Sequence, residues 1–135
     1  MSEIRGKILI IEDDPDIMRL LNRTLSGAGY QVVHAFGGED ALRKVQANVP
    51  DLVLTDLAMP QMSGVQVIQM LKQNPDTAHI PVIAVTAHMW DGIAQSAGQA
   101  GADGFINKPF SSKTLLQEVA AYLSAAPRAV TSRLP

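Results

Sequence analysis

A chain of 135 residues, 47% of them hydrophobic, is long enough for one globular domain with a buried core and leaves little room for a second. A formal net charge of −2 without a basic run argues against direct nucleic-acid binding. The chain contains no Cys, which excludes disulfide scaffolds and cysteine-based zinc sites. Its start has only a short apolar run interrupted by acids, unlike a secretion signal or a membrane span, so we expect a soluble, cytoplasmic protein without membrane contact.

The first strand and helix have clear signals. The run at 7–11 is apolar almost throughout, which is typical of a strand covered on both faces. Asp14 can cap the following helix, Pro15 suits its first turn, and apolar residues recur at helical spacing before Gly29. The residues that we expect to face the core are Ile17, Leu20, Leu21, Leu25 and Ala28.

The middle of the chain continues this alternation. A helix follows Gly37-Gly38 and ends near residue 47, and a third helix ends at about residue 73. Ser63 and Gln66 have the spacing of a capping box, which opens that third helix. The strands that precede these two helices are predicted at 31–35 and 52–55.

The last part of the chain contains one weak element. Within 91–100, Gly92 and Gly98 each cost roughly 1 kcal/mol relative to Ala in a helix interior, so we expect this fourth helix to be the loosest element of the fold. The other predicted elements are strands at 81–85 and 104–107 and a helix at 112–123.

Five strands in strict alternation with five helices predict an α/β fold, with a parallel sheet, right-handed crossovers and helices on both faces. We expect one domain at residues 5–125 and a C-terminal tail or linker stub at 126–135. In doubly wound sheets, ligands bind at the carboxyl ends of the strands.

Polar residues follow four of the predicted strands at that edge. An acidic group at 12–14 follows the first strand, Asp56 the third, Thr86 the fourth and Lys108 the fifth. Carboxylates that meet there repel one another unless a cation compensates, and Mg²⁺ prefers carboxylates, waters and phosphate oxygens. The set therefore predicts a phosphoryl-transfer site: Asp56 as nucleophile, Asp13 as metal ligand, Thr86 as hydroxyl donor and Lys108 as cation.

Each residue alone has a simpler explanation. The acidic group at 12–14 could cap a helix, Asp56 could cap a turn, Thr86 could bond backbone and Lys108 could be an ordinary surface lysine. Four matched groups at the ends of four strands favour the functional interpretation.

The segments "ILIIEDDP", "PDLVLTDLAMPQMSG", "IPVIAVTAH" and "AGADGFINKPF" resemble, in order and spacing, the four signature blocks of response-regulator receiver domains of two-component signalling. The resemblance covers residues 5–123. It implies a doubly wound (βα)5 flavodoxin-like fold with strand order 2-1-3-4-5. It also implies a signalling phosphoacceptor rather than a conventional enzyme, in which Asp56 takes a phosphoryl group from a sensor histidine kinase or a histidine phosphotransfer protein.

The resemblance also implies a metal site. Asp13, Asp56 and the backbone carbonyl of Ala58 would bind Mg²⁺ or Mn²⁺ directly, and Glu12 would act through water. Gly64 matches the family's glycine in the loop after the phosphoacceptor.

The remaining implied residues bind the phosphoryl group or respond to it. Lys108, Thr86 and Ala87 would contact it, and Phe105 would turn inward together with Thr86 to change the surface around the fourth helix, fifth strand and fifth helix. Pro109 follows the lysine through a peptide bond that is typically cis in the family.

Two positions are possible kinetic modulators. Ala58 has no side chain able to hold an attacking water, whereas His88 could do so or could be an ordinary loop histidine. In the same loop, packing of Met89 and Trp90 against the fourth helix is favoured over a role in partner binding.

The output is only partly predicted. Glu118 stands where the winged-helix branch of the family usually carries an arginine for dimer formation, which argues against that output. The motifs are closer to single-domain regulators and hybrid-kinase receivers. We therefore expect a monomer or weak dimer that controls an unidentified downstream protein, or a receiver whose effector domain lies beyond residue 135.

Three alternatives stay open. A flavodoxin-like FMN carrier shares the fold, but the acids at 12–14 would repel its phosphate. A haloacid-dehalogenase-type phosphatase also uses an Asp after a strand, but it needs a second Asp where Ala58 stands. A degenerate receiver that only binds is disfavoured by the complete acidic set.

Overall fold

The structure is a computed structural model that describes residues 5–123. The predicted tail at 126–135, and the last two residues of the predicted domain, lie outside the described residues. Among the described residues, no helix is long and apolar enough to cross a membrane.

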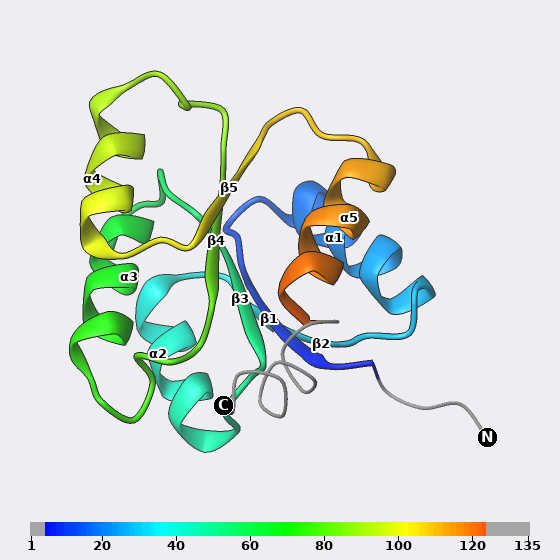
Figure 1. The fold of residues 1–135 in the computed structure, drawn as a ribbon, viewed down its shortest axis with the longest axis horizontal. Coiled ribbons are helices and arrows are strands. Elements are labelled where there is room, and N and C mark those ends of the chain that lie inside the picture. Colours follow the sequence, from blue (N-terminus) through cyan, green and yellow to red (C-terminus); the bar gives the residue numbers. More distant parts are fainter. Residues whose placement is uncertain (1–4, 124–135) are drawn as a thin grey trace, which may run out of the picture.

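A parallel sheet forms the centre of the fold (Figure 1). Its strand order is β2-β1-β3-β4-β5, as the resemblance implied, so the predicted fold class is confirmed. The strands are β1 (Lys7–Ile11), β2 (Gln31–Ala35), β3 (Leu52–Asp56), β4 (Val82–Thr86) and β5 (Gly104–Asn107).

Two strands differ in their bounds from the prediction. The fourth begins at Val82 because Pro81 has no N–H for the ladder and contributes only its carbonyl, which accepts from the Val53 N–H at 3.0 Å, and it ends at Thr86, which was predicted to follow it. The third includes Asp56, which pairs with Val85. Its carboxylate therefore stands on the final residue of a strand rather than in a loop.

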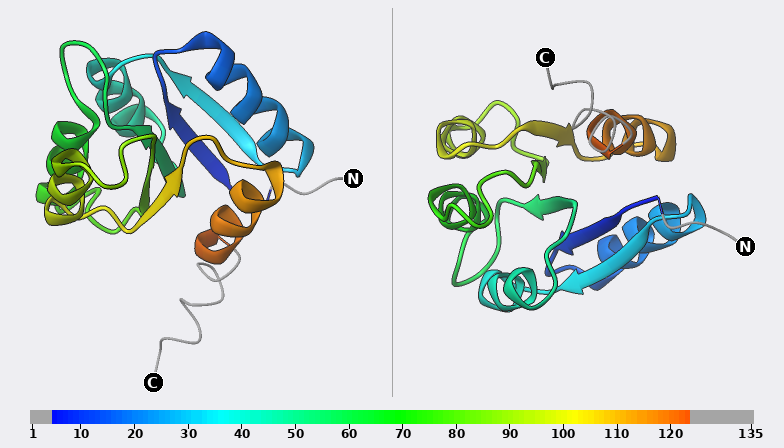
Figure 2. Two further views of the ribbon diagram at one scale, coloured as in Figure 1. Left: turned by 90° about the horizontal axis from the view of Figure 1, so that it is seen from above. Right: turned by 60° about the horizontal axis from the view of Figure 1, so that its bottom comes forward.

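Helices cover both faces of the sheet, as predicted (Figure 2). α1 and α5 pack on one face, and α2, α3 and α4 lie on the other (Figure 1). The helices are α1 (Pro15–Gly27), α2 (Gly38–Ala47), α3 (Gly64–Gln73), α4 (Gly92–Ala100) and α5 (Ser112–Leu123).

Each central strand contributes to two cores because successive side chains point to opposite faces of a sheet. In β1, Ile8 and Ile10 join the core beneath α1 and α5, whereas Leu9 and Ile11 join the core beneath the other three helices. This burial on both faces is the reason for the uninterrupted apolar run.

The predicted helix caps are present. The Asp14 side chain accepts from the N–H groups of Asp16 and Ile17, and Ser63 and Gln66 form the reciprocal capping box. Capping satisfies donors that the first helical turn leaves unpaired.

The prediction that Leu20 faces the core is wrong. Its side chain is 46% exposed, whereas Met18, Leu21 and Leu25 form the buried stripe of α1. Adjacent residues are separated by about 100° around a helix, so Leu20 falls outside this stripe although it is apolar.

The only buried residues of α4 are Ala94 and Ala97. Its large apolar residue, Ile93, is partly buried. The expectation that this helix is the loosest element stays a prediction.

Candidate functional site

The site lies where four strands end, at the upper edge of the sheet in Figure 1. Glu12 follows β1 and is held by its N–H, which donates to the Ala35 carbonyl at 3.0 Å. Lys108 follows β5, and its N–H donates to the carbonyl of Thr86 at 2.9 Å. Backbone bonds between neighbouring strands thus set the positions from which these side chains extend.

Three carboxylates gather at this edge. Oxygen atoms of Glu12, Asp13 and Asp56 all lie within 4.8 Å of one another. Glu12 is buried, Asp56 is mostly buried and Asp13 is exposed. Three hard oxygen donors so close together, open to solvent on one side, fit a divalent cation such as Mg²⁺. Ala58 is exposed in the loop after β3.

Lys108 lies against two of these acids. Its Nζ donates to Glu12 Oε1 at 3.0 Å and lies 3.4 Å from Asp56 Oδ1. The sequence analysis does not predict this direct pair, since it gives Glu12 only a water-mediated role at the metal. The signal was present, because a buried carboxylate needs a partner and Lys108 is the cation at the same edge.

Burial and this ion pair together shift the pKa of both groups. Burial raises the pKa of Glu12 above its ordinary value, and the hydrogen bond from Lys108 offsets only part of that effect. Burial lowers the pKa of Lys108, but the bond to Glu12 and the charge of Asp56 outweigh it, so the net shift is upward. Lys108 is therefore held in its charged form beside Asp56.

The loop after β3 orients Asp56. Its Oδ1 accepts from the Leu57 N–H at 2.9 Å, and the Gly64 N–H donates to the Leu57 carbonyl at 2.9 Å. A Cβ on Gly64 would lie 2.0 Å from the carbonyl oxygen of Asp56 and 2.8 Å from Leu57 Cα. Only glycine allows α3 to begin so close to the strand that ends in Asp56.

Thr86 ends β4 and is completely buried. Its Oγ1 accepts from the His88 N–H at 3.0 Å, which leaves the hydroxyl proton available to another acceptor. Ala87 and His88 are exposed, and the imidazole Nδ1 of His88 lies 2.9 Å from Asp91 Oδ2.

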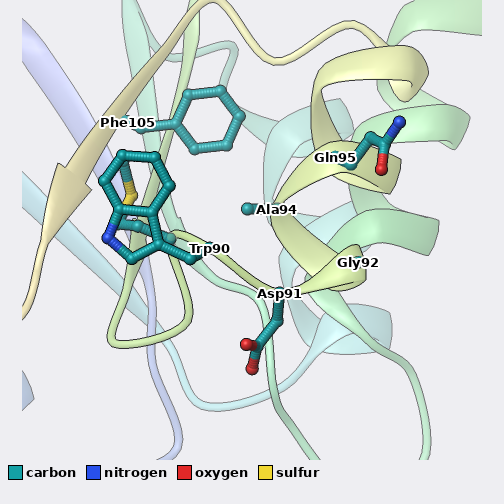
Figure 3. A pocket seen from close by; sticks show the side chains of 7 residues that line it. Trp90, Asp91, Gly92, Ala94, Gln95 and Phe105 are labelled. Carbon is teal, nitrogen blue, oxygen red and sulfur yellow. The ribbon is translucent and has the colours of Figure 1, made fainter.

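A shallow hollow of about 310 Å³ lies beside the amino end of α4 (Figure 3). Phe105, Met89 and Trp90 are among its lining residues. Trp90 is 95% exposed, so the interpretation that it packs against α4 is wrong: the loop turns its indole outward, whereas Met89 is partly buried.

The Lys108–Pro109 peptide bond is cis, as the resemblance implied.

The family model of the response regulator receiver domain matches residues 8–120. Among curated relatives, the polar-differentiation response regulator DivK of Brucella ovis is 34% identical over 119 residues, which cover 88% of this chain and 97% of the relative.

Solved structures agree with this match. The chemotaxis protein CheY4 of Vibrio cholerae superposes with a TM-score of 0.83 at 30% identity, over 87% of this chain and 98% of that one. The receiver domain of the sensor histidine kinase PA1611 from Pseudomonas aeruginosa, solved with a magnesium ion in its active-site cleft, has a TM-score of 0.83 at 25% identity, over 88% and 98%.

Proposed function

Because this chain belongs to the response regulator receiver domain family of two-component signalling, we propose that it is a phosphoacceptor whose Asp56 takes a phosphoryl group from a phosphohistidine. The donor would be a sensor histidine kinase or a histidine phosphotransfer protein. The protein would then control a downstream protein partner by a change in its surface.

One observation carries this proposal. Asp56 Oδ1 lies 3.4 Å from the ammonium of Lys108, within a cluster where oxygens of Glu12, Asp13 and Asp56 are 4.8 Å or less apart. A structural ion pair needs one acid and one base. Two further carboxylates beside that pair only raise repulsion, unless the site receives a cation and a phosphoryl group.

In the proposed reaction, an oxygen of Asp56 attacks the phosphorus of the phosphohistidine. A P–O bond forms while the P–N bond breaks, and the electron pair of that bond leaves on the donor imidazole nitrogen. Lys108 compensates negative charge on the transferring phosphoryl group. Thr86, buried with its hydroxyl proton available, hydrogen-bonds a phosphoryl oxygen after transfer, as does the N–H of Ala87.

The acidic cluster fits a metal by the chemistry of its donors. Asp13, Asp56 and the backbone carbonyl of Ala58 would hold Mg²⁺ or Mn²⁺, and Glu12 would act through water. The bound ion supplies charge neutralisation for the carboxylates and for phosphoryl oxygens. The magnesium ion in the receiver of PA1611 supports this assignment.

The same groups would catalyse the loss of the phosphoryl group by water, so the protein acts on itself rather than turning over a separate substrate. Ala58 has no side chain to hold the attacking water. His88, two residues past Thr86, is the other candidate for this role, and its imidazole Nδ1 lies 2.9 Å from Asp91 Oδ2.

The output surface is proposed to be formed by α4, β5 and α5. Phosphorylation adds nearly two negative charges and strong acceptors, toward which Thr86 would move. Phe105 borders the hollow beside α4 and would follow Thr86 inward, changing the shape of that hollow. Trp90 at its rim is an exposed apolar anchor for a protein partner. We propose a monomer or weak dimer; the cytoplasmic location expected from the sequence stays a prediction.

The domain is proposed to span residues 5–125, with 126–135 as a tail or linker. Limited proteolysis followed by intact-mass measurement tests this boundary, because cleavage should concentrate beyond residue 125.

The test of the function is incubation with acetyl phosphate and Mg²⁺, compared between the wild type and Asp56→Asn by intact mass. The wild type should gain the mass of one phosphoryl group and Asp56→Asn should gain none. Omission of Mg²⁺ should abolish the gain. An unmodified wild type, or equal modification of both proteins, would refute the proposal.

A further inference from the structure

The loop between β4 and α4 is tied together by three hydrogen bonds. The His88 N–H donates to Thr86 Oγ1 at 3.0 Å, the His88 imidazole Nδ1 lies 2.9 Å from Asp91 Oδ2, and the Asp91 N–H donates to the His88 carbonyl at 3.3 Å. His88 thus contacts the phosphate-binding Thr86 through its backbone and the start of α4 through its side chain.

Asp91 stands at the N-cap of α4 but does not cap it. At the N-cap of α1, the Asp14 side chain accepts two helix N–H groups. Asp91 makes no such side-chain bond. Its carboxylate is engaged by the imidazole instead. In Figure 3 it points away from the rings of Trp90 and Phe105, which line the same hollow as Asp91.

The hydrogen bond to Asp91 determines which ring nitrogen of His88 carries the proton. A carboxylate only accepts hydrogen bonds, so Nδ1 must carry the proton that bridges it to Asp91. The bond fixes the orientation of the ring and, through the short loop, the position of the His88 N–H. That N–H in turn fixes the Thr86 hydroxyl as an acceptor, with its proton directed elsewhere.

We propose that Asp91 is a positioning residue that acts through His88 to hold the Thr86 hydroxyl in one rotamer, in which Oγ1 accepts from the His88 N–H and its proton stays available for the phosphoryl group. This proposal rests on the proposed function for its purpose. The latch, by which we mean the hydrogen bonds between Asp91 and His88 and between His88 and Thr86, is present in the unmodified chain. Both side chains are more than half exposed, so the pair contributes little to stability, and its effect is on geometry.

The main test variant is Asp91→Ser. Serine is as good an N-cap as aspartate, so α4 keeps its start, but the serine hydroxyl is one bond too short to reach the imidazole. Asp91→Asn keeps an acceptor oxygen at the right length and is the conservative rescue. Asp76→Ser, which removes an exposed carboxylate from the loop between α3 and β4, is the control for lost charge.

The first readout needs neither metal nor phosphate: the rotamer-sensitive NMR couplings of the Thr86 methyl carbon. They should show one rotamer in the wild type, Asp91→Asn and Asp76→Ser, and rotamer averaging in Asp91→Ser. The ¹⁵N shifts of His88 should report an Nδ1–H imidazole in the wild type and lose that signature in Asp91→Ser. Unchanged couplings in Asp91→Ser would overturn the proposal whatever the protein does with phosphate.

The second readout is the affinity for beryllofluoride with Mg²⁺ present. Loss of one hydrogen bond should weaken binding by roughly 2- to 10-fold in Asp91→Ser and leave Asp91→Asn near the wild type. In a His88→Ala background, Asp91→Ser should have no further effect. An equal effect in both backgrounds would show that Asp91 acts without His88. A wild type that fails to bind the probe would count against the proposed function, and the couplings would still decide the latch.

Discussion

Lys108 Nζ lies 3.0 Å from Glu12 Oε1, although the two residues are 96 positions apart in the chain. They follow β5 and β1, which are separated in the sheet by β3 and β4. The Glu12 side chain is only 2% exposed, so Lys108 compensates a carboxylate that is almost completely shielded from solvent. The cation of the candidate site is therefore also part of what stabilises the fold.

Replacement of this cation should destabilise the protein. Lys108→Met leaves Glu12 buried without its partner, and we expect a loss of about 1–3 kcal/mol in the free energy of unfolding at neutral pH. Urea denaturation of this variant and of Lys113→Met, which removes an exposed lysine of α5, provides the comparison. Equal stability of the two variants would mean that the pair has no structural role.

The raised pKa of Glu12 predicts a pH dependence. Its folded pKa is above the unfolded value of 4.5, so the native state binds more protons than the unfolded state between the two values. The contribution of Glu12 to stability is complete below pH 4.5 and is lost as the pH rises through the folded pKa. Glu12→Gln removes this slope, so the stability of the wild type relative to Glu12→Gln should fall with rising pH. Chemical denaturation in EDTA measures it; a difference that rises with pH would contradict the raised pKa.

Mg²⁺ should stabilise the wild type by mass action, by about 2.7 kcal/mol at a concentration 100 times its dissociation constant. Asp13→Asn should gain much less from Mg²⁺. In EDTA it should be at least as stable as the wild type, because one of three clustered carboxylates is neutralised. Thermal melts with Mg²⁺ and with EDTA test both statements, with Asp76→Asn as control. A similar Mg²⁺ response in all three proteins would place the ion elsewhere.

Gly64 and Gly92 form a matched pair, because each is the first residue of a helix. A Cβ on Gly64 would clash with the backbone of Asp56, whereas a Cβ on Gly92 would meet nothing within 4 Å. We expect Gly64→Ala to lower the free energy of unfolding by about 1–3 kcal/mol and to weaken Mg²⁺ binding, since the backbone beside Asp56 must move. Gly92→Ala should retain both properties. Chemical denaturation and Mg²⁺ titration measure the two properties. If Gly64→Ala kept the stability and the Mg²⁺ affinity of the wild type, the contact with Asp56 could relax.

Gly98→Ala should stabilise α4. A Cβ there would lie 3.8 Å from Phe105 Cζ, an ordinary contact, and the helix would gain up to about 1 kcal/mol in propensity. Amide hydrogen exchange should slow in α4 more than in β1 or β3. Wild-type α4 amides as protected as those of the central strands would contradict the expectation of a loose helix.

Much of the fold followed from local patterns. The doubly covered strands were visible because burial on both faces demands unbroken apolar runs, and the helix starts because Asp14 and Ser63 satisfy orphan N–H groups. Leu20 marks the limit of such reasoning: its apolar character suggested burial, and only the packing of α1 showed that it lies outside the buried stripe.

The sequence by itself determined which chemical groups stand at the strand ends. Polar and charged residues follow the apolar runs there, and burial of such a side chain costs free energy unless it has a partner or a function. Tertiary structure decided how they pair. Lys108 reaches Glu12 as well as Asp56, the Asp91 carboxylate engages His88 rather than α4, and Trp90 points outward. These outcomes depend on distances between side chains from separate elements or on the path of a loop, and no local pattern of apolar and polar residues encodes either.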